Sequence, residues 1–253
     1  MATDSHDPAG SSSIDRVIAR GIAPLLWSRL LRICHEQTSN GPVTVLDCGG
    51  GSGSLAVPLA GQGALVTVVD LSIDALATLL RRSAEAGVSD RVTAVQGDVE
   101  ALSDALPTAE YDLVLAHGLL ENLPNPAEAI AQIAAVLRPG GVASLVIANP
   151  VAAVLGRLLA GDVAAALDNF HRSAATGYDL TAATSQSIAA GLIVESVEGV
   201  GMFTDLVPGI QLDRPGVMRA LAELEAAAAS TSPYRDIAGR LHLVARRPMT
   251  ASG

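Results

Sequence analysis

The central part of the chain alternates between short apolar runs and helical patterns, and few folds accept this order. The expected strands are 43–47, 65–70, 92–95, 111–116 and 142–148. Helical patterns over 54–61, 73–86 and 126–137 separate several of them. Apolar strands that alternate with helices are typical of a parallel sheet with helices on both faces. The alternation therefore predicts an α/β fold for residues 43–148.

The flanking segments complete one predicted domain, residues 14–248, which follows a disordered tail at 1–13 that is rich in Ser, Asp and Gly. A helical element is expected over 14–37, where Pro24 suits a first helical turn. We expect this element and a helical insertion at 150–178 to cover the side on which a substrate binds. The remaining expected elements are a helical insertion at 213–230 and strands at 192–201 and 241–246.

Local signals predict where some elements begin and end. Ser72 is of the residue type that caps a helix N-terminus, and Gly87 is of the type that follows a helix. The segment Arg-Pro-Gly-Gly at 138–141 predicts a sharp turn before the strand that starts at Val142.

Charge and composition exclude several classes of function. The chain has 16 basic residues, all of them arginine, against 26 acidic ones, for a net charge of −10. The lack of lysine excludes Schiff-base chemistry and a Walker loop, and the acidic balance disfavours DNA as a partner. Cys34 and Cys48 have no neighbours at zinc-ligand spacing, so no metal site is expected. The polar start and the interrupted apolar stretch 151–167 predict a cytoplasmic protein without a signal peptide or a membrane span.

A glycine-rich loop follows the first predicted strand, in the segment Val-Leu-Asp-Cys-Gly-Gly-Gly-Ser-Gly at 45–53. Glycines let a ligand approach the backbone closely, and the next helix offers free N–H groups at its start. Asp70 closes the second strand, where a carboxylate can accept both hydroxyls of an adenosine ribose. The loop therefore predicts a nucleoside-containing cofactor. The alternative is a loop that serves only packing, with Asp70 as a helix cap.

Asp47 separates two cofactor classes. The segment 51–56 also matches GxGxxA, the dinucleotide pattern, but a carboxylate two residues before the first glycine would repel a pyrophosphate. The same carboxylate suits S-adenosylmethionine, which has an ammonium group and no phosphate. Asp98 follows the third strand, where it can read the adenine amino group, and Ala116 and His117 lie beside the expected transfer point after the fourth. The residues thus favour S-adenosylmethionine.

These segments resemble the class I S-adenosylmethionine-dependent methyltransferases. The resemblance rests on VLDCGGGSG at 45–53, VVDLS at 68–72, QGDVE at 96–100, AHGLLENLPNP at 116–126 and LRPGG at 137–141. It implies methyl transfer and a Rossmann-like, seven-stranded sheet whose last strand is antiparallel, with 43–148 as the cofactor-binding core. Taken with the arguments above, the expected cofactor-binding residues are Arg20, Asp47, Gly49, Gly50, Gly51, Gly53, Asp70, Leu71, Asp98, Val99, Ala116 and His117.

Over most of its length the chain is also similar to the tRNA carboxymethoxyuridine methyltransferase family, which turns a wobble-uridine carboxylate into its methyl ester. The similarity is carried by LLW at 25–27, DCGGG at 47–51, HGLLE at 117–121, NP at 125–126, GD at 161–162, NF at 169–170, GVGMFTD at 199–205, LAELE at 221–225, PY at 233–234, GRLH at 239–242 and ARRP at 245–248. It implies the tRNA anticodon loop as the methyl acceptor. The lysine-rich run that this family has after its Asn-Phe element is absent from 171–178. A small-molecule methyltransferase is therefore a second hypothesis, and a non-catalytic S-adenosylmethionine-binding protein is a third.

The sequence offers candidates, but no firm assignment, for the acceptor side. His117 is a candidate to line the methionine end of the cofactor or to act as a base. A hydroxyl or amine acceptor needs such a base, whereas a carboxylate is already ionised at neutral pH. Arg235 and Arg240 are candidates to hold an acceptor carboxylate through the planar guanidinium, and Arg20 is a candidate for the carboxylate of the cofactor. His171 and His242 are further candidate bases, expected to be structural or surface residues.

Overall fold

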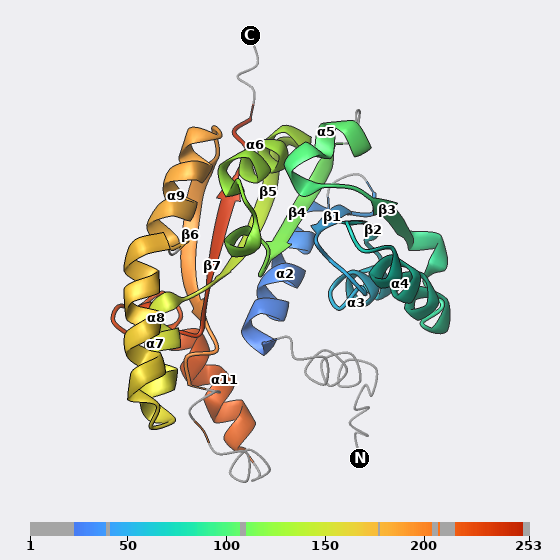
Figure 1. The fold of residues 1–253 in the computed structure, drawn as a ribbon. Coiled ribbons are helices and arrows are strands. Elements are labelled where there is room, and N and C mark those ends of the chain that lie inside the picture. The colour runs from blue at the N-terminus through green and yellow to red at the C-terminus, as the bar shows by residue number, and fades with distance from the viewer. Residues whose placement is uncertain are drawn as a thin grey trace, which may run out of the picture.

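The computed structural model describes residues 23–38, 41–106, 110–176, 178–203, 207 and 216–249. The expected tail at 1–13, the first part of the element at 14–37 and Arg20 lie outside the described residues. Within the described part, seven strands form one sheet with helices on either side (Figure 1).

The sheet has the predicted Rossmann-like plan. Its strands are β1 (Thr44–Cys48), β2 (Leu65–Asp70), β3 (Val92–Gln96), β4 (Tyr111–His117), β5 (Leu137–Ala148), β6 (Ile193–Val200) and β7 (Arg240–Arg246). Their spatial order is β3-β2-β1-β4-β5-β7-β6. The strands β1 to β5 pair in parallel, whereas β7 lies between β5 and β6 and is antiparallel to both. The prediction of seven strands with an antiparallel last strand is confirmed.

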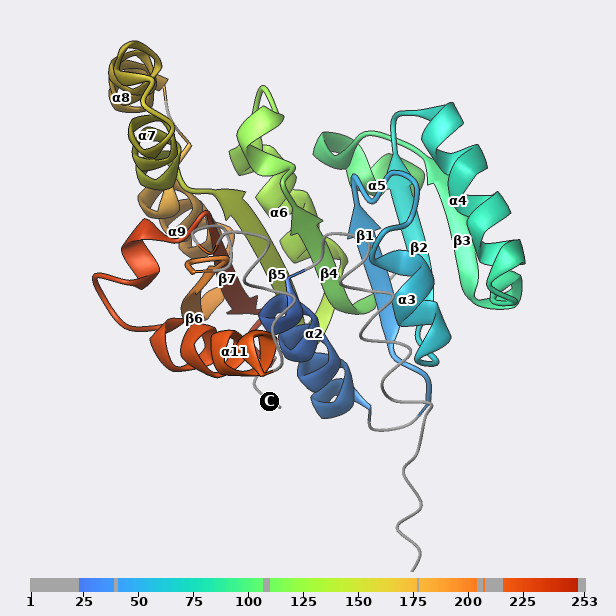
Figure 2. The same cartoon turned by 90° about the horizontal axis from the view of Figure 1, so that it is seen from below.

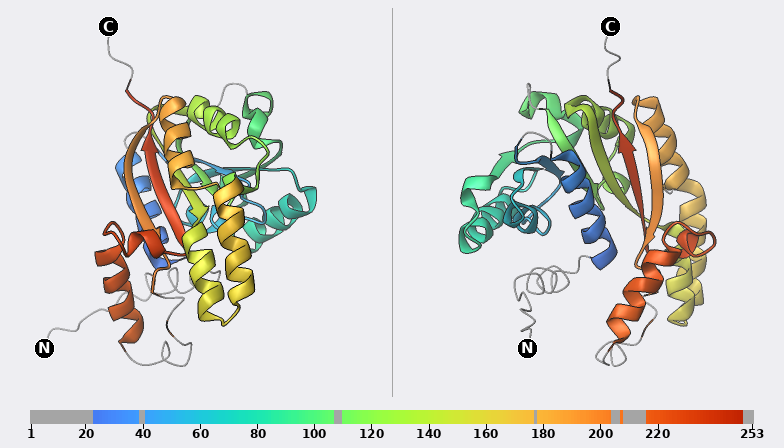
Figure 3. Two further views of the ribbon diagram at one scale, coloured as in Figure 1. Left: turned by 60° about the vertical axis from the view of Figure 1, so that its left-hand side comes forward. Right: turned by 180° about the vertical axis from the view of Figure 1, so that it is seen from behind.

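The helices cover both faces of the sheet. They are α2 (Pro24–Gln37), α3 (Ala56–Gly61), α4 (Ile73–Glu85), α5 (Leu102–Ala105), α6 (Pro126–Val136), α7 (Pro150–Leu159), α8 (Val163–Thr176), α9 (Leu180–Ala189) and α11 (Val217–Ala228). Short 3-10 turns are η1 (Ser89–Arg91), η2 (Val99–Ala101), η3 (Leu120–Asn122) and η5 (Arg235–Ile237). Helices α2, α3 and α4 share one hydrophobic layer with the strands, and α5, α6 and α9 share the other. In Figure 3, α2 is in front of the strands in the right-hand view and behind them in the left-hand view.

Local sequence explains where several helices begin and end. Ser72 accepts a hydrogen bond from the backbone N of Ala75 at 3.2 Å and caps α4, as predicted. Gly87 follows α4 with a φ of +70°, which suits glycine. Proline occupies the first turn of α2, α6 and α7, where its missing N–H costs no helical hydrogen bond.

The predicted turn at 138–141 is wrong, because this segment belongs to β5. Tyr111 pairs with Leu137 and Leu113 pairs with Val142, so β5 advances five residues while β4 advances two. The three extra residues form a bulge, which Gly140 accommodates with a φ of +77°. Proline and glycine therefore mark an irregularity within a strand here rather than the end of an element.

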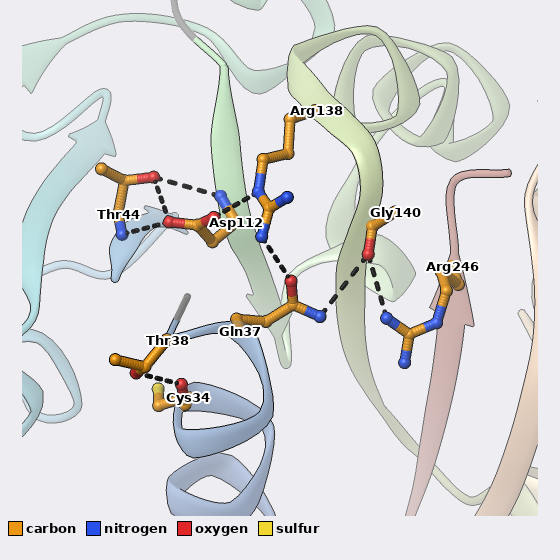
Figure 4. A network of polar contacts seen from close by, with 8 residues as sticks. All are labelled: Cys34, Gln37, Thr38, Thr44, Asp112, Arg138, Gly140 and Arg246. Atoms are coloured by element: carbon orange, nitrogen blue, oxygen red, sulfur yellow. Dashed lines mark hydrogen bonds and ion pairs between the residues drawn. The ribbon is translucent and has the colours of Figure 1, made fainter. Parts of the chain in front are cut away.

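A polar network at the amino edge of the sheet holds the end of α2 (Figure 4). The carboxylate of Asp112 accepts hydrogen bonds from the backbone N and the hydroxyl of Thr44 at 2.7 and 2.8 Å, and it pairs with Arg138. Arg138 in turn donates to Gln37 of α2 at 2.8 Å, and Arg246 donates to the carbonyl of Gly140 at 2.9 Å. The network ties α2, β1, β4, β5 and β7 together at the end opposite the glycine loop.

The predicted insertion after the fifth strand is a helical hairpin of α7 and α8. It extends beyond the sheet in two perpendicular views (Figures 1 and 2). Its exposed large apolar side chains are Val151, Leu155, Leu158, Leu159, Val163, Leu167 and Phe170. In the part of the chain that the structure describes, no helix combines the length and the apolar character needed to cross a membrane.

Candidate functional site

The glycine loop connects β1 to α3 at the carboxyl edge of the sheet. Gly49, Gly51 and Gly53 have φ values of +65°, +53° and +79°, a region that only glycine adopts readily. Gly50 is needed for another reason, because a Cβ atom there would lie 2.5 Å from the carboxylate of Asp47. The loop therefore presents backbone rather than side chains beside Asp47, which suits the close approach of a ligand.

Asp70, at the end of β2, braces this loop. One carboxylate oxygen accepts a hydrogen bond from the backbone N of Gly51 at 2.9 Å, and the other accepts one from the backbone N of Ser72 at 2.8 Å. Ser72 itself is the N-cap of α4. Asp70 is thus more than a helix cap, since it joins the loop after β1 to the start of α4. Each of its oxygens can accept a further hydrogen bond.

Asp47 is buried at the base of the loop, with only 3% of its surface exposed. Burial, together with a smaller effect of the nearby charge of Asp70, raises the pKa of its carboxyl to about 7. A cation bound against Asp47 would favour the ionised form and reverse this effect. Asp47 is therefore a buried carboxyl whose charge depends on what lies against it.

The other residues predicted for the adenosine end follow the same edge. Leu71, directly after β2, is 66% exposed. Asp98 is exposed and accepts a hydrogen bond from the backbone N of Glu100 at 2.9 Å, while Val99 and Ala116 are buried.

A cavity of about 290 Å³ opens at the carboxyl edge of the sheet, beside Asp47 and His117. It brings together five predicted residues, namely Asp47, Gly49, Gly50, His117 and Arg240. Six residues that were not among the predicted site residues complete the wall: Ala23, Leu26, Ser54, Leu55, Gly118 and Val146. Leu26 and Gly118 lie in motifs of the family resemblance, whereas the other four are small or apolar and have no chemical signature that could have identified them. Asp70, Leu71, Asp98 and Val99 are not part of this wall.

His117 lies in the cavity wall as an uncharged group. Its Nε2 atom is 2.9 Å from the hydroxyl of Ser144, and that hydroxyl is 2.8 Å from Nε2 of His242. Burial, with smaller effects of His242 and Arg240, lowers the pKa of His117 to about 3. Burial and the charge of Arg29 lower the pKa of His242 to about 4. His242, which was expected to be a structural or surface residue, is completely buried.

The two candidate arginines differ in their surroundings. Arg240 begins β7 opposite Ala148 and lines the cavity, because the reversed direction of β7 brings its first residue to the carboxyl edge. Among the described residues, no ion pair or hydrogen bond engages the guanidinium of Arg240. Arg235 instead donates to the carboxylate of Asp236 at 2.8 Å and lies outside the cavity wall. The structure therefore leaves one guanidinium available in the cavity.

In the described ranges of the chain, no three His, Cys, Asp or Glu side chains form a group that could hold a metal ion. The cavity instead combines a buried carboxylate, bare loop backbone, a neutral imidazole and a free guanidinium. Such a set can bind a zwitterion at its amino group and place an anion near it.

The chain is similar to known methyltransferases in sequence and in fold. Residues 45–141 match the family model described as "Methyltransferase domain". The chain is 30% identical over 234 residues to a tRNA 5-carboxymethoxyuridine methyltransferase of Escherichia coli O157:H7, which covers 89% of this chain and 88% of that protein. It is 38% identical over 98 residues to a ubiquinone biosynthesis O-methyltransferase of Serratia proteamaculans, covering 39% of each chain.

A solved structure shows the same fold. The magnesium protoporphyrin IX methyltransferase of Synechocystis, crystallised with bound S-adenosylhomocysteine, aligns with a TM-score of 0.58 and 15% identity, over 97% of this chain and 90% of that one. S-adenosylmethionine is the cofactor of this class of enzyme, and it supplies a methyl group on a sulfonium when bound. The buried carboxylate of Asp47 beside bare glycine backbone fits its ammonium group. The chain belongs to the class I S-adenosylmethionine-dependent methyltransferases and is similar over most of its length to the tRNA 5-carboxymethoxyuridine methyltransferases.

Proposed function

We propose that this methyltransferase esterifies a carboxylate, and that its acceptor is the carboxymethoxy group of a wobble uridine in the tRNA anticodon loop. The observation that carries the proposal is the guanidinium of Arg240, which is unpaired among the described residues and lies in the same cavity as the glycine loop. A planar guanidinium matches both oxygens of a carboxylate and so fixes its position. In this proposal the enzyme works in the cytoplasm, where it meets tRNA.

The cofactor would lie along the carboxyl edge of the sheet. We propose that Asp47 pairs with its ammonium group and that Gly49, Gly50, Gly51 and Gly53 let it approach the backbone. Asp70 would accept the ribose hydroxyls while Leu71, Val99 and Asp98 face the adenine. Ala116 and His117 would flank the methionine end. The proposal extends this role to Arg20 for the cofactor carboxylate, on sequence grounds alone.

A carboxylate acceptor agrees with the neutral His117. A carboxylate is ionised at neutral pH and attacks without losing a proton, so its methylation needs no general base. Attacking anion and sulfonium cation have opposite charges, and both charges disappear as the methyl group moves. A partly dehydrated cavity therefore favours the transition state. A base with a pKa of about 3 would be a weak proton acceptor for a hydroxyl.

The tRNA acceptor draws its support from relatives that cover most of this chain. The tRNA 5-carboxymethoxyuridine methyltransferase of E. coli O157:H7 covers 89% of this chain, including the helices and strands outside the methyltransferase core. By its name, that protein acts on a substrate that carries a carboxylate on a uridine. Arg240 lies in that outer part of the chain, in the segment GRLH at 239–242.

A second candidate is a small, apolar acceptor, and a specific observation favours it. The hairpin of α7 and α8 exposes seven large apolar side chains beyond the carboxyl edge of the sheet, and the chain carries a net charge of −10. An acidic protein with an apolar surface near its site is less suited to a polyanion than a basic one.

Methyl transfer to defined tRNAs decides between these candidates. We would incubate the protein with S-adenosylmethionine labelled in the methyl group and with tRNA that carries carboxymethoxyuridine, and use the same tRNA with an unmodified wobble uridine as the matched control. The proposal expects label only in the first tRNA, in a bond that mild base cleaves because it is an ester, and a transfer rate that falls with salt. Absence of label from the modified tRNA at low salt would overturn the tRNA acceptor.

A further inference from the structure

A serine hydroxyl lies between two histidine rings directly behind the cavity. The Oγ atom of Ser144 is 2.9 Å from Nε2 of His117 and 2.8 Å from Nε2 of His242. The two rings stand edge to face, with centroids 6.1 Å apart and an angle of 73° between their planes. Ser144 and His242 have no exposed surface, so the contact is shielded from water.

The strand register explains why these side chains meet. Val146 of β5 is the partner of His117 on β4 and of His242 on β7, so all three point to the same face of the sheet. Ser144 lies two residues earlier on β5 and shares that face. Helix α2 covers it, because Val146 packs in the same hydrophobic layer as Leu26 and Leu30.

Counting protons limits the forms that the pair of histidines can take. The Ser144 hydroxyl has one hydrogen, so it can donate to only one of the two Nε2 atoms. The other Nε2 must itself carry a proton and donate to the hydroxyl oxygen. At least one ring is therefore the Nε2–H tautomer. The Nδ1 atoms of both rings are buried without a hydrogen-bond partner among the described residues.

We propose that Ser144 and His242 are positioning residues that hold the ring of His117 in a single, uncharged form in the cavity wall. This inference rests on the proposed methyl transfer in this cavity. A neutral ring there serves that reaction, because a protonated His117 would repel the sulfonium and would hold the acceptor carboxylate in its ionic form. Because Nε2 of His117 bonds to the Ser144 hydroxyl, the protonation of its Nδ1 depends on the direction of that bond, which is set together with the tautomer of His242.

The charges around the pair favour the uncharged form. Arg240 of β7 and Arg29 of α2 are cations that oppose protonation of His117 and His242, respectively. The acids on the same face of the sheet include Glu198 of β6, which pairs with Arg29 at 2.8 Å, and, further from the rings, Asp47 of β1 and Asp70 of β2. No acid among the described residues bonds to either ring.

The test reads the ring nitrogens directly. In protein labelled with 15N-histidine, the nitrogen chemical shifts report the tautomer and charge of each ring, and His117→Gln and His242→Gln assign the signals. We expect both rings to stay neutral from about pH 8 to about pH 5, with His117 in one tautomer. In Ser144→Ala, which leaves the rest of the ring environment in place, the His117 signals should become those of a tautomer mixture.

Kinetics give the second measurement, and it separates a positioning role from a binding role. For Ser144→Ala we expect kcat with the modified tRNA to fall about tenfold, which is the effect of one hydrogen bond, while the Kd for S-adenosylhomocysteine changes by less than about threefold. His242→Gln keeps an N–H donor for Ser144 and should retain more kcat than His242→Leu. His35→Gln, at an exposed position of α2, is the matched control and should behave as the wild type.

Either of two results would overturn the inference. One is a wild-type His117 that titrates near pH 6.5 or shows mixed tautomers, and the other is an unchanged ring signal in Ser144→Ala. Neither result depends on the acceptor. If the rings behave as expected but the modified tRNA receives no methyl group, the proposed acceptor is wrong and the role of Ser144 stands.

Discussion

The backbone N–H of Gly51 donates a hydrogen bond of 2.9 Å to the carboxylate of Asp70, which lies 19 residues further along the chain. This bond joins the loop after β1 to the end of β2. The second oxygen of Asp70 accepts from the backbone N of Ser72 at 2.8 Å, where α4 begins. One carboxylate thus fixes the shape of the loop and its position relative to the next helix.

Replacing Asp70 should therefore weaken cofactor binding. Asp70→Ala removes the proposed ribose acceptor and also frees the loop. Hydrogen bonds to a charged group contribute about 1.5–3 kcal/mol, so we expect the affinity for S-adenosylhomocysteine to fall about 10- to 150-fold by calorimetry. Asp70→Asn keeps one oxygen, and its affinity should lie between those of the wild type and Asp70→Ala. Asp104 is an exposed acid on α5, and Asp104→Ala should bind as tightly as the wild type. Equal affinities in all four proteins would show that Asp70 serves the fold alone.

Asp47 should make both stability and cofactor binding depend on pH. Its pKa is about 7 in the folded protein and near 3.8 in the unfolded chain, so the folded state binds the extra proton between these values. The stability that the protonated group contributes is present at low pH and is lost as pH rises towards 7. Each pKa unit corresponds to about 1.4 kcal/mol, so from about pH 5 to pH 8 we expect the free energy of unfolding to fall by about 2–3 kcal/mol more in the wild type than in Asp47→Asn. Urea unfolding at each pH measures this difference.

Cofactor affinity should change with pH in the opposite direction, because binding favours the ionised form of Asp47. The ammonium of the cofactor favours ionised Asp47, so affinity should rise from about pH 6 to pH 8 in the wild type and stay low and flat in Asp47→Asn. A wild-type affinity that does not change with pH would place the ammonium elsewhere.

Adding one methyl group at Gly50 should weaken cofactor binding through a collision of side chains and not through strain of the backbone. Its φ is not positive, but a Cβ atom would lie 2.5 Å from the carboxylate of Asp47 and 3.0 Å from Val68. Gly50→Ala should therefore displace Asp47 and weaken S-adenosylhomocysteine binding at least tenfold, about the effect of losing one charged hydrogen bond. Gly61→Ala at the end of α3 meets no atom within 4 Å and is the matched control, with unchanged binding. Normal binding by Gly50→Ala would mean that Asp47 can move aside.

Arg240 should affect the acceptor and not the cofactor. Arg240→Ala removes the free guanidinium of the cavity, and we expect kcat/KM for the modified tRNA to fall about 10- to 150-fold with the Kd for S-adenosylhomocysteine nearly unchanged. Arg235→Ala is the control on the same side, since Arg235 is paired with Asp236 outside the cavity wall. A loss of kcat/KM in Arg235→Ala alone would show that Arg235, and not Arg240, holds the acceptor.

Asp112 should support stability at the opposite edge of the sheet. Its carboxylate accepts two hydrogen bonds from Thr44 and pairs with Arg138, which holds Gln37 of α2. Asp112→Ala leaves these donors without their acceptor, so we expect a loss of about 1–3 kcal/mol in the free energy of unfolding, measured in urea. Cofactor affinity at permissive temperature should not change, and a large loss of affinity would show that the two edges are coupled.

Sequence predicted the sheet and the cofactor loop well because both rest on local signals. Apolar runs that end at Asp47, Asp70 and His117 indicate buried strands and mark where these strands reach the carboxyl edge of the sheet. The glycines after Asp47 show where the backbone has no side chains. The bulge at 138–141 was misjudged, because Pro and Gly look the same in a turn as in an irregular strand. Pairing with Tyr111 decides the matter, and that contact is not local.

The wall of the cavity was the least predictable part. Leu26 and Val146 reach it from α2 and β5, and only the packing of those elements brings them together. Arg235 and Arg240 could not be separated in sequence, since the difference depends on Asp236 and on the direction of β7. The contact of Ser144 with two histidines likewise depends on the register of three strands.

The interior position of β7 has a consequence for how the protein is made. Of the seven strands, β7 is the last to leave the ribosome, yet its place is between β5 and β6. Until it arrives, two strands have open facing edges, and the cavity lacks the residue that begins β7. A growing chain can therefore form the glycine loop early, whereas Arg240, the residue that we propose holds the acceptor, takes its place only after all seven strands have been synthesised.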